Sequence, residues 1–181
     1  MSASSEHPSA PFGPVRRVVT GHSPTGDAMV LQDSSVAGRY YVPESKSPCY
    51  DLHYASTLPA SNDAELKDGK WKDEIQDHPE VPPALNASSF RCWDFAPGDV
   101  TPAHRTQSLD YGIVMKGSVV LELDNGERTT LNEGDTVVQR GTMHTWRNET
   151  SEWCKMYFVM IGANPVEIGD MKLVEEFRAA K

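Results

Sequence analysis

His104 and Asp110 stand six residues apart in the stretch PGDVTPAHRTQSLDYG, and His144 lies further along in QRGTMHTW. Two imidazoles and one carboxylate form the 2-His-1-carboxylate centre, which holds a divalent metal and leaves positions open for substrate or oxygen. The same groups can move protons without a metal, because histidine titrates near neutral pH. The sequence therefore leaves two chemistries open for His104, Asp110 and His144: metal ligation and metal-free acid–base catalysis.

Polar and aromatic residues close to these three are candidates for substrate binding. Thr106 lies two residues from His104, so on a strand both side chains face the same way. The Arg140 guanidinium could meet a carboxylate or an enolate, and Tyr111 and Trp146 offer aromatic walls. The expected substrate site consists of Thr106, Tyr111, Gln139, Arg140 and Trp146.

The segments that must position these residues have mostly the sequence pattern of β-strands. The segment SVVLELDNGERTTL places Val119, Leu121 and Leu123 on one face and then turns at Asn-Gly. Asn-Gly is a strong hairpin signal because both central residues of a type I′ turn need φ > 0. Further short apolar runs, bounded by turns and with no helical segment between them, favour an antiparallel sandwich or barrel. In a small closed barrel, inward-facing side chains from separate strands meet in one cavity.

We expect a disordered leader over residues 1–14, because MSASSEHPSAPFGP lacks the basic and apolar regions of a secretory signal. A single domain should follow over residues 15–165. It opens with the hairpin RRVVTGHSPTGDAMVLQDS, turning at residues 24–27. Residues 45–89 show little periodicity and indicate a long, partly ordered surface loop.

The tail, residues 166–181, is the one segment that favours a helix. Asp170 can cap it, and Leu173, Val174 and Phe177 share one helical face. The sequence therefore predicts a short C-terminal helix packed on the barrel. In the long loop, Tyr50 and Trp71 are the side chains expected to hold it to the body of the domain.

Two motifs in residues 90–162 resemble those of the cupins. The first motif of that family, G-x5-H-x-H-x3,4-E-x6-G, is matched by Gly98, His104, Thr106, Asp110 and Gly117. The second, G-x5-P-x-G-x2-H-x3-N, is matched by Gly134, Gly141, His144 and Asn148. The resemblance implies an all-β, antiparallel cupin β-barrel, also called a double-stranded β-helix or jelly roll.

Departures from the family pattern bear on the metal. Thr106 stands at the second histidine, Asp110 replaces the glutamate and Gln139 stands near the proline. A neutral hydroxyl is a poor ligand and Asp is one methylene shorter than Glu. A divalent metal such as Fe, Mn or Zn on His104, Asp110 and His144 therefore remains one alternative. His53 is the candidate for replacing the missing ligand.

The phrases HRTQSLDYGIVMKG and VVQRGTMHTWRN are similar to the small cupin-domain oxidoreductases of fungal polyketide clusters, which make salicylaldehyde-type products. The resemblance implies an enzyme that tailors a polyketide-derived small molecule in secondary metabolism. Oxidoreduction and acid–base dehydration or aromatisation are both open. A non-catalytic metabolite-binding cupin and a metal-dependent dioxygenase are the alternatives.

Composition limits the partners. The net charge of -9, from 26 acidic and 17 basic residues, argues against nucleic acid and an anionic membrane. Three cysteines at irregular spacing indicate a reducing compartment, so we expect a cytoplasmic protein. No G-x-G-x-x-G follows a strand, so no nucleotide cofactor is expected. The N-terminal strands suit edge pairing, which favours a homodimer.

Overall fold

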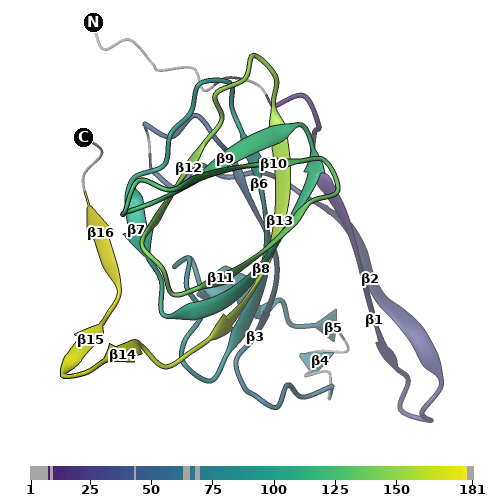
Figure 1. Ribbon diagram of the computed structural model, residues 1–181. Coiled ribbons are helices and arrows are strands. Elements are labelled where there is room, and N and C mark those ends of the chain that lie inside the picture. The colour runs from purple at the N-terminus through teal and green to yellow at the C-terminus, as the bar shows by residue number, and fades with distance from the viewer. Residues whose placement is uncertain (1–7, 9, 43, 63–65, 68–69, 179–181) are drawn as a thin grey trace, which may run out of the picture.

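The computed structural model of this chain describes residues 8, 10–42, 44–62, 66–67 and 70–178 (Figure 1). Over these residues it consists of strands and turns, with one helical element, the short 3₁₀ helix η1 (Glu74–Asp77). The all-β prediction is confirmed. No helix in the described part of the chain is long and apolar enough to cross a membrane. The expected leader falls largely outside the described residues.

Two antiparallel five-stranded sheets in the described chain face one another as a barrel (Figure 1). In spatial order, the first sheet contains β10 (Arg128–Asn132), β9 (Ser118–Leu123), β12 (His144–Arg147), β7 (Ala103–Arg105) and β16 (Glu176–Arg178). The second contains β11 (Thr136–Arg140), β8 (Ser108–Lys116), β13 (Cys154–Gly162), β6 (Ser88–Phe95) and β3 (Cys49–Ala55). The expected jelly-roll barrel is therefore present.

The barrel core follows from period-two alternation on the strands. On β13, the alternate residues Met156, Phe158 and Met160 are buried, while Val159 between them is exposed. Val119 and Leu121 of β9 pack into the same apolar cluster. Because alternate strand residues point to opposite faces, this pattern turns one face of each strand inward.

Turn geometry fixes how β8 passes into β9. Gly117 joins the two strands with a φ of 76°, and a Cβ there would lie 2.6 Å from the Trp153 carbonyl oxygen. A side chain would thus meet both an unfavourable backbone conformation and a backbone atom. The glycine at the end of the first motif is therefore required by packing as well as by the turn.

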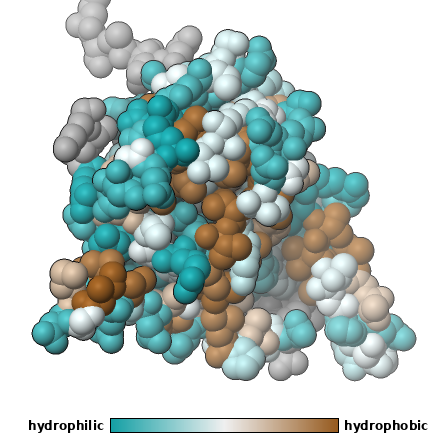
Figure 2. All heavy atoms as spheres, viewed as in Figure 1, coloured by the Kyte–Doolittle hydropathy of each residue, from teal (hydrophilic) through white to brown (hydrophobic). Residues whose placement is uncertain are grey.

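Both predicted hairpins are confirmed. β9 and β10 pair across the turn that contains Gly126, whose φ is 87°. β1 (Val15–His22) and β2 (Ala28–Val36) pair antiparallel in a separate two-stranded sheet that extends from the barrel (Figure 1). Apolar atoms gather over this hairpin in Figure 2. Met29 and Val30 of β2 are exposed. A homodimer formed through these strands stays a prediction.

The C-terminal helix was a wrong prediction. β14 (Val166–Ile168) and β15 (Met171–Leu173) form a hairpin that turns at Gly169, whose φ of 58° suits glycine. β16 then pairs with the edge of β7, matching Phe177 to His104. The apolar residues of this tail have a helical spacing, but the tail instead pairs with an open strand edge. That pairing is a tertiary contact, which local helix propensity does not predict.

The expected surface loop over residues 45–89 contains a sheet strand. Tyr50, Leu52 and Tyr54 of β3 are buried, and β3 pairs with β6. Apolar and polar residues alternate over most of the short run CYDLHYA with the period of a strand. The polar residues on either side made this pattern hard to recognise in the sequence. The rest of the segment includes β4 (Leu66–Lys67), β5 (Lys70–Trp71) and η1. Trp71 is half-buried against His53.

Candidate active site

A cavity of about 470 Å³ lies inside the barrel. Its polar lining includes His104, Thr106, Asp110 and His144. Its apolar lining includes Trp93, Phe95, Trp146, Phe158, Met160 and Phe177. Side chains from both sheets thus meet in one space that is mostly aromatic and carries a small polar group of residues, the composition typical of a small-molecule site.

The two imidazoles are cross-strand neighbours. His104 of β7 and His144 of β12 are directly opposite in register, and their ring centroids lie 4.3 Å apart with planes tilted by 51°. A register shift of one residue would turn either ring to the other face of its sheet. The pairing of these two short strands is therefore what brings the rings together.

Backbone carbonyls contact one nitrogen of each imidazole. Nδ1 of His104 lies 2.8 Å from the Pro102 oxygen, and Nδ1 of His144 lies 3.0 Å from the Thr142 oxygen. Burial lowers the pKa of His104, and burial followed by the charge of His104 lowers the pKa of His144 to about 3. Both rings are consequently neutral near pH 7.

Asp110 reaches the cavity from β8 in the opposite sheet. Its Oδ1 is buried and has no hydrogen-bond partner among the described residues. Burial raises the pKa of the Asp110 carboxyl to about 6, and the nearby Ser108 hydroxyl opposes that rise. In the described chain no hydrogen bond or ion pair joins Asp110 to either imidazole.

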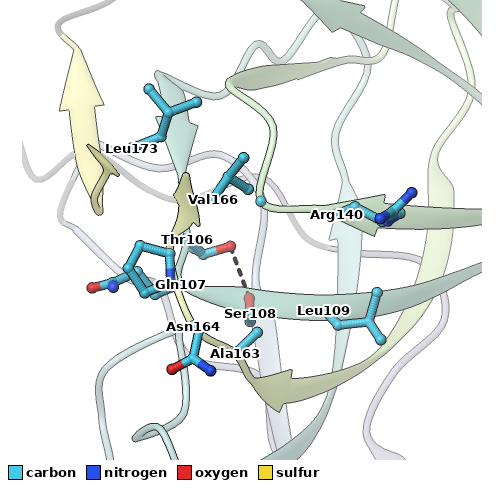
Figure 3. Close-up of a pocket in the computed structure, with 11 residues that line it drawn as sticks. Thr106, Gln107, Ser108, Leu109, Arg140, Ala163, Asn164, Val166 and Leu173 are labelled. Carbon is cyan, nitrogen blue, oxygen red and sulfur yellow. Dashed lines mark hydrogen bonds between the residues drawn. The ribbon is translucent and has the colours of Figure 1, made fainter. Parts of the chain in front are cut away.

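Thr106 stands in the wall between two cavities. It lines the space around the histidines and also a second cavity of about 250 Å³. The Ser108 hydroxyl donates to Thr106 Oγ1 at 2.9 Å, as the dashed line in Figure 3 shows. Arg140, which is exposed, lines the second cavity and not the first. The structure therefore separates Arg140 from the histidines.

The remaining sequence-predicted residues fall in three places. Trp146 lines the histidine cavity and is buried. Gln139 is buried beside His144, with its amide nitrogen 3.0 Å from Nδ1. Tyr111 is 44% exposed and faces outward, because it follows the inward-facing Asp110 on one strand. The proposed substrate contacts of Tyr111 and Arg140 are thus not supported by their positions.

Phe177 is a cavity residue that sequence reasoning missed. Its ring lies parallel to that of His104, with centroids 5.7 Å apart and 7° between the planes. A Gly-Asp turn between two short runs that contain apolar residues, within residues 166–173, was the available sign of a hairpin rather than a helix. His53, the suggested replacement ligand, is exposed and stacks on Trp71 away from the cavity.

The metal centre of His104, Asp110 and His144, one of the two alternatives left open by the sequence, is not assembled in the described part of the chain. The donor types would suit a divalent ion, and the orphaned Asp110 oxygen is a candidate donor. Yet among the described residues no three His, Cys, Asp or Glu side chains lie close enough together to hold a metal. Asp110 comes from the opposite sheet on a side chain one methylene shorter than Glu. The residues present do not fit a three-ligand site.

Comparison with known proteins places the chain in a family. A model described as "Cupin domain" matches residues 91–160. The "Phomopsin biosynthesis cluster protein C'" of Diaporthe leptostromiformis is 45% identical over 98 residues, covering 52% of this chain and 51% of that protein. The chain thus spans about half the length of that relative.

A second relative matches over a longer range. The "Cupin-domain-containing oxidoreductase virC" of Hypocrea virens is 31% identical over 166 residues, covering 88% of this chain and 81% of that protein. A solved double-stranded β-helix protein of Klebsiella pneumoniae is 21% identical and covers 51% of this chain and 76% of its own, with a TM-score of 0.42. With both motifs in place and a relative matched over most of its length, the chain belongs to the cupin family.

Proposed function

We propose that the chain is an enzyme of secondary-metabolite biosynthesis that transfers protons on a small, largely apolar carbonyl compound inside the barrel. Relatives named as biosynthesis-cluster proteins and as oxidoreductases support a metabolic role. The aromatic lining of the cavity supports an apolar, polyketide-type substrate. Enolisation, and dehydration or aromatisation built on it, is the reaction class that the polar residues support best.

The observation that carries this proposal is the environment of Asp110. Its buried Oδ1 has no hydrogen-bond partner among the described residues, and such an atom costs roughly 1–3 kcal/mol, so a purely structural residue is poorly placed there. With a pKa raised to about 6, the carboxyl can both take and return a proton near neutral pH. Carboxyl groups with raised pKa values are typical of acid–base sites.

The proposed reaction starts at the carbon next to a carbonyl group. The C–H bond breaks, its proton moves to the Asp110 carboxylate and its electron pair forms the C=C bond of an enolate. The neutral imidazoles of His104 and His144 lie in the same cavity and can hydrogen-bond the oxygen functions of the substrate. When a hydroxyl lies β to the carbonyl, the protonated Asp110 can return its proton to that hydroxyl. The enolate then re-forms its C=O bond, a C=C bond forms between the α and β carbons, and the bond from the β carbon to oxygen breaks to release water.

The proposal can be tested without the natural substrate. α-Tetralone incubated in D₂O exchanges the protons beside its carbonyl, and NMR follows the exchange. We expect catalysed exchange by the wild-type chain and at least a hundredfold slower exchange in Asp110→Asn, the range typical of general-base loss. Asp124→Asn, on the exposed β9–β10 turn, is the matched control. Equal exchange in Asp110→Asn and wild type would remove Asp110 from the mechanism.

Oxidoreduction is a second candidate, favoured by the name of the virC relative. Because that chemistry needs an electron carrier, elemental analysis of the purified protein separates the two. One equivalent of iron, manganese or zinc that disappears in His104→Ala would favour the redox function. Undiminished tetralone exchange after thorough chelation would favour proton transfer.

A further inference from the structure

Nδ1 of His144 faces two groups of opposite kind. The Thr142 carbonyl oxygen, which can only accept, lies at 3.0 Å, and the Gln139 amide nitrogen, which can only donate, also lies at 3.0 Å. A neutral imidazole carries one ring proton. Nδ1 can therefore satisfy only one of these neighbours, and the choice decides whether Nε2 carries the proton.

Contacts around Gln139 favour its amide nitrogen as the group that faces His144. Gln139 is 4% exposed on β11, opposite Asp110 in register. Its amide nitrogen donates to the Thr142 carbonyl oxygen at 3.3 Å and also contacts the Thr142 hydroxyl oxygen. Turning the amide over would set its own oxygen against that carbonyl oxygen, which is repulsive. The nitrogen is thus held among acceptors, one of them Nδ1 of His144.

In the described part of the chain, Nδ1 of His104 does not face a donor and an acceptor at once. Among the described residues, Nδ1 of His104 contacts the Pro102 carbonyl oxygen at 2.8 Å, so the neutral ring must donate from Nδ1. Nε2 of His104 then has a lone pair and no proton. An imidazole whose Nδ1 donates to a backbone carbonyl oxygen is fixed in the Nδ1–H tautomer.

We infer that Gln139 is a positioning residue that holds His144 in the Nε2–H tautomer, opposite to the tautomer of His104. The catalytic role given to this pair of tautomers rests on the proposed function. The histidine pair then offers the cavity one N–H donor and one acceptor, from rings whose centroids are 4.3 Å apart. That pattern matches a β-hydroxycarbonyl compound, with its carbonyl oxygen accepting from His144 and its hydroxyl donating to His104.

The tautomers can be read directly. The chain labelled with ¹⁵N-histidine is studied at pH 8 by long-range ¹H–¹⁵N correlation NMR, which distinguishes Nδ1–H from Nε2–H rings. We expect an Nε2–H pattern for His144 and an Nδ1–H pattern for His104 in the wild type. An Nδ1–H pattern for both rings would overturn the inference, whether or not any variant folds.

Two substitutions test the cause. Gln139→Glu is nearly isosteric but can only accept, and Gln139→Leu leaves the Thr142 carbonyl as the remaining neighbour. In both, His144 should change to the Nδ1–H pattern, whereas Gln107→Leu, beside the second cavity, should change neither ring. An unchanged His144 pattern in folded Gln139→Glu would contradict the assignment to Gln139.

The rate of tetralone exchange adds a functional measurement. Loss of one hydrogen-bond donor to an enolate oxygen typically costs about 10²–10³ in kcat. We expect kcat in Gln139→Glu to fall by at least about tenfold, with little change in KM. The tautomer spectrum needs no substrate, so failure of this inference is distinguishable from failure of the proposed function, which rests on Asp110.

Discussion

Phe177 lies flat against His104, with ring centroids 5.7 Å apart and 7° between the planes. The two residues are also directly opposite one another where β16 pairs with β7. The aromatic ring thus covers an imidazole from an edge strand, and both residues line the histidine cavity. Substrate fit should therefore depend on a residue of the C-terminal tail.

Phe177→Ala should weaken substrate binding more than it slows proton transfer. Removing the ring opens one apolar wall while leaving Asp110 and His144 in place, so KM for α-tetralone should rise several-fold and kcat should change less. Since Phe177 is 57% exposed, stability should change by at most about 1 kcal/mol. Ile168→Ala, on the exposed β14, is the control. Steady-state exchange rates check this, and an unchanged KM would contradict it.

The exchange rate should depend on pH through Asp110. The proposed base must be ionised, and the pKa of Asp110 is raised by burial to about 6. The rate should therefore rise from pH 4.5 to pH 7 with a midpoint near that value and then level off. A pH–rate profile of tetralone exchange measures the midpoint. A flat profile over this range would mean that another group takes the proton.

His144 should make the fold less stable as the pH falls. Its folded pKa is lowered to about 3, whereas an unfolded histidine has a pKa of about 6.5. Between these values the unfolded state binds the extra proton, so the contribution to stability is full above pH 6.5 and is lost as the pH falls. Between pH 6.5 and pH 5 the loss should be roughly 2 kcal/mol.

Urea unfolding of wild type and His144→Gln at several pH values isolates this effect. The difference in unfolding free energy between the two chains should shrink towards acid pH. Asp110 acts in the opposite sense in both chains, because a raised carboxyl pKa favours the folded state at low pH. Parallel pH dependences for the two chains would show that His144 has the same pKa in the folded and unfolded states, which would contradict the lowered value.

Gly117→Ala should be more destabilising than Gly26→Ala. Both glycines have positive φ, 76° and 89°, so each substitution strains the backbone by about 1 kcal/mol or more. At Gly117 the new Cβ would also meet the Trp153 carbonyl oxygen at 2.6 Å, whereas at Gly26 it enters open space. Thermal unfolding of both variants should show a clear excess loss for Gly117→Ala.

Local patterns in the sequence were enough to predict the class of fold and part of the cavity wall, namely His104, Thr106, Asp110, His144 and Trp146. The alternation around Leu121 and the turn at Gly126 depend on neighbouring residues alone, and both hairpins were found. The motif spacing likewise indicated that His104 and His144 come from separate strands. The structure places both rings and Asp110 on one cavity, while their roles stay predictions.

Contacts between distant segments could not be predicted. β16 pairs with β7 across some seventy residues of chain, and nothing local to Phe177 reports that edge. The motif spacing grouped Asp110 with the two histidines, but no hydrogen bond or ion pair joins its carboxyl to either ring in the described chain. The donors and acceptors at Nδ1 depend on the exact turn that carries Thr142, which spacing cannot reveal.

β16 is joined to the barrel by three residue pairs, Glu176 with Arg105, Phe177 with His104 and Arg178 with Ala103. Because the pairing is so short, a few substitutions in β16 can change it while the strands that carry the two imidazoles stay unchanged. Among related chains, sequence differences in this tail would change which molecules fit the histidine cavity without changing the residues proposed to transfer protons. Under the proposed function, substrate selectivity would then depend on β16, and proton transfer on residues of the barrel strands.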